Sequence, residues 1–137
     1  MSNPFVEIKI DTQGGLHTTL THGPSSAKLS TDAPRDNGGE GSSFSPTDLV
    51  AAALASCAVT TMALAAKREN IPWGAMSARV EKHMSAAPRR VGELVLELSM
   101  PRELPQDKRH HLEEVARNCP VARSLGADVK QTILFKY

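Results

Sequence analysis

An uncharged run of 18 residues, Leu49–Ala66, constrains the fold of this chain more than any other feature. The residues just before it are typical of a helix start. Ser45 fits the N-cap position, Pro46 fits the first helical position, and Asp48 fits the position of the acidic residue in a capping box. Eight of the 18 residues are Ala and three are Ser or Thr, a composition that argues against a membrane span. The run therefore predicts a long buried helix of roughly 30 Å at 1.5 Å per residue.

A helix that is apolar on all sides must be covered on all sides. A chain of 137 residues has little material with which to surround one. We therefore expect a homodimer in which a second copy covers part of this helix. The many small side chains allow helix backbones to approach closely.

The rest of the chain predicts strands on both sides of this helix. Residues 90–100 alternate, with Leu94, Leu96, Leu98 and Met100 on one face and Glu93 and Glu97 on the other. A second helix carries an apolar stripe of Leu112, Val115, Ala116 and Cys119. The predicted order is strands 5–10, 16–22 and 27–31, a Gly-rich loop 33–45, the long helix, a hairpin 75–86 and 90–100, helices 105–118 and 121–125, and strand 129–135. This order predicts one α+β domain over residues 1–137, with antiparallel strands.

Charge and composition exclude several classes of partner. Sixteen Lys and Arg oppose fifteen Asp and Glu, for a formal charge of +1, and there are only five aromatic residues. The chain therefore offers neither the basic field nor the stacking platform that nucleic-acid binding needs. The first twenty residues contain no apolar core of the kind a signal peptide requires. We expect a cytoplasmic protein that uses neither nucleic acid nor a membrane.

Two cysteines, Cys57 and Cys119, lie 62 positions apart, which fits neither a secreted disulfide scaffold nor a zinc knuckle. Each has a plain interpretation as a small hydrophobic residue filling space in the core. The alternative is a pair of working thiols, with the sulfur of Cys119 near the amino end of the helix that starts at Pro120. A metal site of both cysteines and a histidine lacks any usual ligand spacing, so we expect neither a metal nor a bound cofactor.

The segments around these cysteines, Ser45–Cys57 and Asn118–Leu125, resemble the osmotically inducible protein C and organic hydroperoxide resistance (OsmC/Ohr) family, in its OsmC-like branch. The order of elements is similar along essentially the whole chain. The resemblance implies an intertwined homodimer with two long central helices and sheets outside. It also implies a thiol peroxidase in which Cys57 is peroxidatic and Cys119 resolving, with an external dithiol of lipoyl or thioredoxin type as reductant.

A thiolate at neutral pH needs a group that lowers the thiol pKa. In the peroxidase branch an Arg in the first hairpin and a Glu ten residues before the peroxidatic Cys supply this. In this sequence Leu16 occupies the position of that Arg, and Thr47 occupies the position of that Glu. Asp48, on the opposite helix face from Cys57, either acts across the dimer or only caps the helix. Arg35 is the candidate replacement cation or else a solvated loop charge; the other basic groups within possible reach are His17, His22 and Arg123.

The leading functional hypothesis is therefore a peroxidase for small organic hydroperoxides, with weaker action on hydrogen peroxide, in oxidative or osmotic stress defence. The alternative is a dimer of the same fold that binds or senses a small hydrophobic ligand with little turnover. Loss of peroxide consumption in Cys57→Ser would distinguish the first from the second.

Overall fold

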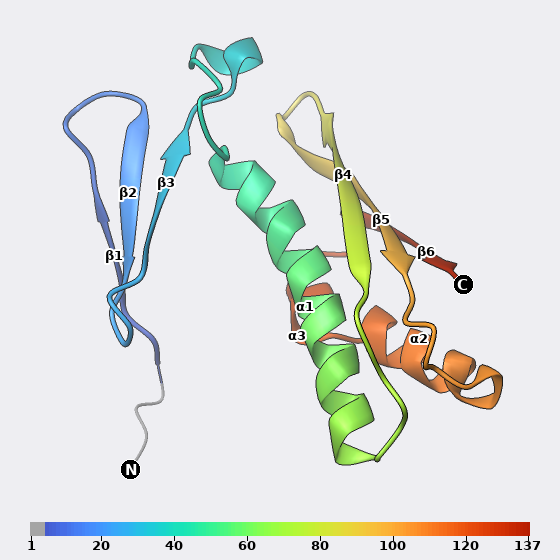
Figure 1. The fold of residues 1–137 in the computed structure, drawn as a ribbon. Helices are drawn as coiled ribbons and strands as arrows, with labels where there is room; N and C mark the ends of the chain where they lie inside the picture. The colour runs from blue at the N-terminus through green and yellow to red at the C-terminus, as the bar shows by residue number, and fades with distance from the viewer. Residues whose placement is uncertain (1–4) are drawn as a thin grey trace. The chain divides into compact units, whose positions relative to one another are not determined.

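The computed structural model describes residues 5–137, which fall into two compact units, Met1–Leu49 and Val50–Tyr137. The first unit is a three-stranded antiparallel sheet in the order β1-β2-β3 (Figure 1). Its strands are β1 (Ile8–Asp11), β2 (His17–His22) and β3 (Lys28–Asp32). The turn between β1 and β2 contains Gly14 at φ 97°, a backbone conformation that glycine adopts at no steric cost.

The predicted loop 33–45 is folded back onto β3. It contains one 3-10 turn, Arg35–Asn37, and returns so that the N–H of Asp32 donates to the carbonyl of Phe44 at 3.0 Å. The hydroxyl of Ser43 also donates to the carbonyl of Ser30 at 2.9 Å. The loop is thus held by backbone and side-chain hydrogen bonds to the strand before it.

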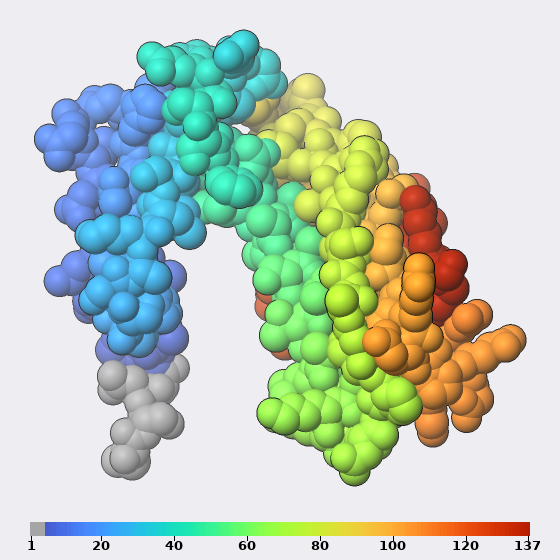
Figure 2. All heavy atoms as spheres, in the orientation of Figure 1, coloured from blue at the N-terminus to red at the C-terminus, as the bar shows by residue number. Residues whose placement is uncertain are grey.

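Helix α1 (Pro46–Arg68) contains the predicted apolar run. The second unit continues with β4 (Ser77–Ser85), β5 (Arg90–Ser99), α2 (Arg109–Arg117), α3 (Pro120–Ser124) and β6 (Lys130–Lys136). In the space-filling view its surface runs without a gap from α1 through β4 and β5 to β6 (Figure 2). The α+β class and the order of elements are confirmed, except that the start of the predicted helix 105–118 is a separate 3-10 turn, Gln106–Lys108.

The expectation of antiparallel strands throughout is wrong for the last strand. The second sheet has the order β4-β5-β6, and β5 pairs antiparallel with β4 but parallel with β6. Parallel neighbours require a crossover of a dozen or more residues, usually helical. The segment that contains α2 and α3 supplies that crossover, so the sheet is mixed.

The core of the second unit lies on the leucine side of β5. Leu94, Leu96 and Leu98 are fully buried, as the alternation predicts, and Glu93 and Glu97 lie on the opposite face, where they pair with Lys130 and Lys136. The residues of α1, α2 and the following turn that complete this core are Ala51, Leu54, Ala58, Met62, Ala66, Leu112, Ala116 and Cys119. The amide of Gln131 in β6 donates to the carbonyl of Ala122 at 3.0 Å and so ties α3 to the sheet.

Helix α1 is not buried on all sides within one chain. Its buried residues form one stripe, and an exposed stripe of Ala53, Ser56, Thr60 and Leu64 runs along another side. By length and composition alone the helix could cross a membrane, a test that core helices of water-soluble proteins also pass. The exposed stripe is the surface that the expected second copy would cover.

Candidate active site

The two cysteines come from different elements of the second unit. Cys57 lies in the middle of α1 and is half-buried, whereas Cys119 is fully buried and immediately precedes α3. Cys119 has extended backbone angles (φ −62°, ψ 157°), as expected for a cap residue, and Pro120 occupies the first helical position. Both cysteines are free, and their sulfurs are not at bonding distance.

The sulfur of Cys57 is surrounded by hydrogen-bond donors. The hydroxyl of Thr61, one helical turn further along α1, lies 3.7 Å from it. Burial raises the pKa of the Cys57 thiol, but hydrogen bonds from the backbone N–H of Val121, the Thr61 hydroxyl and the Cys119 thiol outweigh it and lower that pKa below its ordinary value. Hydrogen bonds to a charged form stabilise that form, so the thiolate of Cys57 is favoured.

The thiol of Cys119 is perturbed in the opposite direction. Burial raises its pKa, the backbone N–H groups of Ala122 and Val121 oppose this, and the neighbouring sulfur of Cys57 raises it further. The two thiols are therefore coupled, with the thiolate stabilised at Cys57 and disfavoured at Cys119. Chemically, this arrangement suits a nucleophile and a second thiol that reacts after it.

The predicted activating groups have other contacts in the structure. Ser45 and Asp48 form a reciprocal capping box: the N–H of Asp48 donates to Ser45 Oγ at 3.1 Å, and the N–H of Ser45 donates to Asp48 Oδ2 at 2.8 Å. Arg35 lies in the 3-10 turn of the first unit, where its Nε donates to the carbonyl of Glu40 at 3.0 Å. An effect of either residue on Cys57 stays a prediction.

The remaining sequence candidates also have contacts of their own. Arg123 Nε donates to the carbonyl of Asn118 at 3.0 Å, and His22 Nδ1 pairs with Ser25 Oγ at 2.6 Å. Leu16 is exposed, and Thr47 shares a hydrogen bond with Ser45. Within residues 5–137, neither cysteine belongs to a group of side chains that could hold a metal ion.

Sequence reasoning missed the two donors that matter at Cys57. Thr61 has no role in the sequence analysis, although its i, i+4 spacing from Cys57 places the two side chains next to each other on a helix. The N–H of Val121 is a backbone group, and only the packing of α3 against α1 reveals it.

Comparisons with known proteins agree with this arrangement. The model of the family described as OsmC-like protein matches residues 39–133. The crystal structure of a candidate osmotic-stress-induced and detoxification response protein from Psychrobacter arcticus 273-4 is 36% identical over 98% of both chains, with a TM-score of 0.89. No curated protein matches the chain.

Two further solved structures share the fold at lower identity. Organic hydroperoxide resistance protein OsmC from Legionella pneumophila is 23% identical over 100% of both chains, with a TM-score of 0.77. An organic hydroperoxide resistance protein from Elizabethkingia anophelis is 16% identical, covers 98% of this chain and 97% of its own, and has a TM-score of 0.77. With the family model covering most of the sequence, the chain belongs to the OsmC-like protein family.

Proposed function

We propose that this protein is a cytoplasmic thiol-dependent peroxidase that reduces organic hydroperoxides, and hydrogen peroxide less well, in defence against oxidative or osmotic stress. The observation that carries the proposal is the placement of two free thiols from different elements next to each other, with Cys57 half-buried in α1 and Cys119 buried just before α3. Hydrogen bonds to the Cys57 sulfur, one of them from the Cys119 thiol, lower the pKa of Cys57, as a nucleophilic thiol requires. The names of the Legionella and Elizabethkingia proteins support hydroperoxides as the substrate class.

In the proposed reaction the thiolate of Cys57 attacks the terminal oxygen of the hydroperoxide. The O–O bond breaks, the alcohol leaves after taking up a proton, and Cys57 becomes a sulfenic acid. The thiol of Cys119 then attacks the sulfenic sulfur, water leaves, and a disulfide forms. An external dithiol of lipoyl or thioredoxin type reduces this disulfide by exchange and restores both thiols.

The donors around Cys57 remove the need for a nearby cation. All the groups that lower its pKa are neutral: a backbone N–H, a hydroxyl and a thiol. The presence of Leu16 and Thr47 at the family's activating positions is therefore compatible with a reactive thiolate. The two sulfurs are not at bonding distance, so they must approach each other before a disulfide can form.

The test is stopped-flow consumption of cumene hydroperoxide and hydrogen peroxide by the reduced protein, followed by mass spectrometry. We expect wild type to lose two hydrogens, Cys119→Ser to stop at the sulfenic acid, and Cys57→Ser to consume no peroxide. Ser77→Ala, an exposed change in β4 outside the α1 stripe, is the matched control and should behave as wild type. Thiols that survive excess peroxide in wild type would contradict the proposal and favour the ligand-binding alternative.

The disulfide provides a second, independent measurement. Closing a loop of 62 residues should stabilise the oxidised protein by up to about 4 kcal/mol on the chain-entropy model. Denaturant unfolding of the oxidised and reduced forms measures this difference. Equal stability of the two forms would count against a bond between Cys57 and Cys119.

A further inference from the structure

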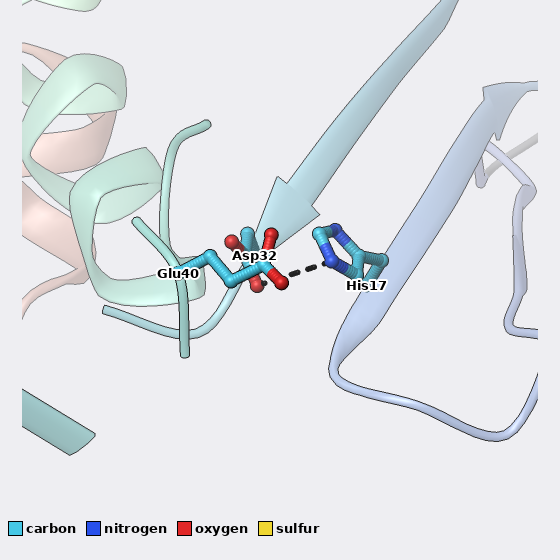
Figure 3. Close-up of side chains that lie close together, drawn as sticks. All are labelled: His17, Asp32 and Glu40. Carbon is cyan, nitrogen blue, oxygen red and sulfur yellow. Dashed lines mark ion pairs between the residues drawn. The ribbon is translucent and has the colours of Figure 1, made fainter. Parts of the chain in front are cut away.

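Three ligand-type side chains converge in the first unit, apart from the thiol pair. His17 and Asp32 are direct partners in the pairing of β2 with β3, so their side chains lie on the same face of the sheet. Glu40 reaches them from the folded loop (Figure 3). One ligand atom from each of the three residues lies within 4.8 Å of the other two.

The backbone of the loop fixes the position of Glu40. A Cβ at Gly39 would lie 1.8 Å from the carbonyl oxygen of Ala33, so only glycine fits there. The N–H of Gly39 donates to the carbonyl of Pro34 at 2.9 Å, and Arg35 holds the carbonyl of Glu40 itself. The loop backbone therefore turns tightly just before Glu40 and brings this residue close to Asp32.

Asp32 carries a buried oxygen without a hydrogen bond. The residue is only 1% exposed, and its Oδ2 accepts two hydrogen bonds from Ser42, from the N–H at 3.0 Å and from the hydroxyl at 2.8 Å. Its Oδ1 receives none, and the Nε2 of His17 lies 3.7 Å away, beyond hydrogen-bond distance. Leaving a buried carboxylate oxygen unpaired costs free energy, which a cation at this point would offset.

We propose that His17 Nε2, Asp32 Oδ1 and the Glu40 carboxylate bind a divalent transition-metal ion, with Zn²⁺ as the best match. Imidazole nitrogen favours Zn²⁺ over Mg²⁺ or Ca²⁺, which take oxygen ligands. The two carboxylates balance the charge of the ion, and Ser42 acts as the outer partner that orients Asp32.

The geometry needs only small movements. Ligand atoms at about 2.0–2.1 Å from a tetrahedral Zn²⁺ lie about 3.3 Å from each other. The present separation of 3.7 Å between His17 and Asp32 is close to that value. His17 and Glu40 are exposed and can adjust, whereas Asp32 is fixed. Three protein ligands leave a fourth position, which faces solvent, for water or a small anion.

The test is calorimetric titration of the full chain with Zn²⁺ in a Cys57→Ser/Cys119→Ser background, which removes the thiols as competing ligands. We expect one Zn²⁺ per chain. His17→Gln and Glu40→Gln should each weaken binding at least tenfold, because removing a ligand costs no less than the roughly 10–100-fold loss seen for outer partners. His22→Gln, on the same strand, is the matched control and should bind as the parent does.

Replacing Zn²⁺ with Co²⁺ gives a second readout, the visible absorption spectrum of the bound ion, which reports the ligands of the ion and not the stability of the protein. Co²⁺ at this site should show the visible absorption of a four- or five-coordinate ion with nitrogen and oxygen ligands, and His17→Gln should lose it. Absence of stoichiometric binding, or equal affinity in His17→Gln and the parent, would overturn the proposal. Because both cysteines are replaced, this result is independent of the peroxidase proposal.

Discussion

At the scale of single residues, the hydroxyl of Thr61 lies 3.7 Å from the sulfur of Cys57 and, after the N–H of Val121, helps to lower the pKa of that thiol. We expect Thr61→Val to raise the pKa of Cys57, because it removes a hydrogen bond that stabilises the thiolate. The thiolate is present above the pKa and lost as pH falls, so the pH profile of peroxide consumption should move to higher pH.

The rate at neutral pH should fall by less than the thiolate fraction. A higher pKa lowers the thiolate fraction, but a more basic thiolate is a better nucleophile, and this offsets part of the loss. Thiolate absorbance against pH measures the pKa, and stopped-flow kinetics measures the rate. Ser77→Ala, an exposed change in β4 outside the α1 stripe, is the control. An unchanged thiol pKa in Thr61→Val would show that the hydroxyl has no part in activation.

The identities of Cys57 and Cys119 as the candidate pair were available from the sequence, but the cause of their reactivity was not. The sequence analysis searched for charged side chains and selected Arg35 and Asp48, because a sequence specifies side chains but not which backbone groups will lie near a sulfur. The N–H of Val121 belongs to every non-proline residue and becomes a donor to Cys57 only through tertiary packing. The proximity of His17 to Asp32 was equally unpredictable from the sequence, since only the strand register pairs the two residues.

At the scale of elements, the start of α1 depends on its capping box. Ser45→Ala should lower the free energy of unfolding by about 1 kcal/mol, because the buried hydroxyl accepts a hydrogen bond from the N–H of Asp48. Denaturant unfolding measures the loss, with Ser56→Ala as the control.

The same box allows the role of Asp48 to be tested. We expect Asp48→Asn to reduce stability by a similar or smaller amount and to leave the pKa of the Cys57 thiol unchanged. The measurement is again thiolate absorbance against pH. A raised thiol pKa in this variant would show that Asp48 activates Cys57, as the alternative interpretation of the sequence holds.

Elements with strong local signals were predictable, and long-range pairing was not. Pro46 and the capping residues marked the start of α1, and the alternation of Leu94, Leu96 and Leu98 marked β5 with its buried face. The direction of β6 could not be predicted from its own residues, because a short alternating segment has the same sequence pattern in a parallel and in an antiparallel pair. It was decided by the crossover through α2 and α3.

At the scale of the whole molecule, residues 5–137 expose apolar side chains on two surfaces that matter for assembly. One is the stripe on α1 that includes Leu64, which is 42% exposed. The other is the face of the first sheet where Ile8, Ile10 and Leu29 lie exposed. Because exposed apolar patches often mark an interface, we propose that the protein is a homodimer.

Light scattering at micromolar concentration should therefore give a mass of about 29 kDa, twice the 14.7 kDa of one chain. Leu64→Glu should shift the protein toward the monomer, because it places a charge on the α1 stripe that the second copy covers. Lys108→Glu, an exposed change outside both surfaces, should keep the dimer. A wild-type mass of 14.7 kDa would refute the dimer.

The parallel pairing of β6 with β5 also has a consequence for the order in which the surroundings of Cys57 assemble. On the ribosome, α1 and Cys57 emerge long before α3, and β6 is synthesised last. Until β6 pairs with β5, Gln131 cannot hold Ala122, and the N–H of Val121 has no fixed place beside the sulfur. A nascent chain that ends after β5 thus lacks the Val121 N–H that lowers the pKa of Cys57 in the full chain. On the proposed mechanism, the donors around the peroxidatic thiol are therefore complete only once Cys119, the proposed resolving thiol, has also been synthesised.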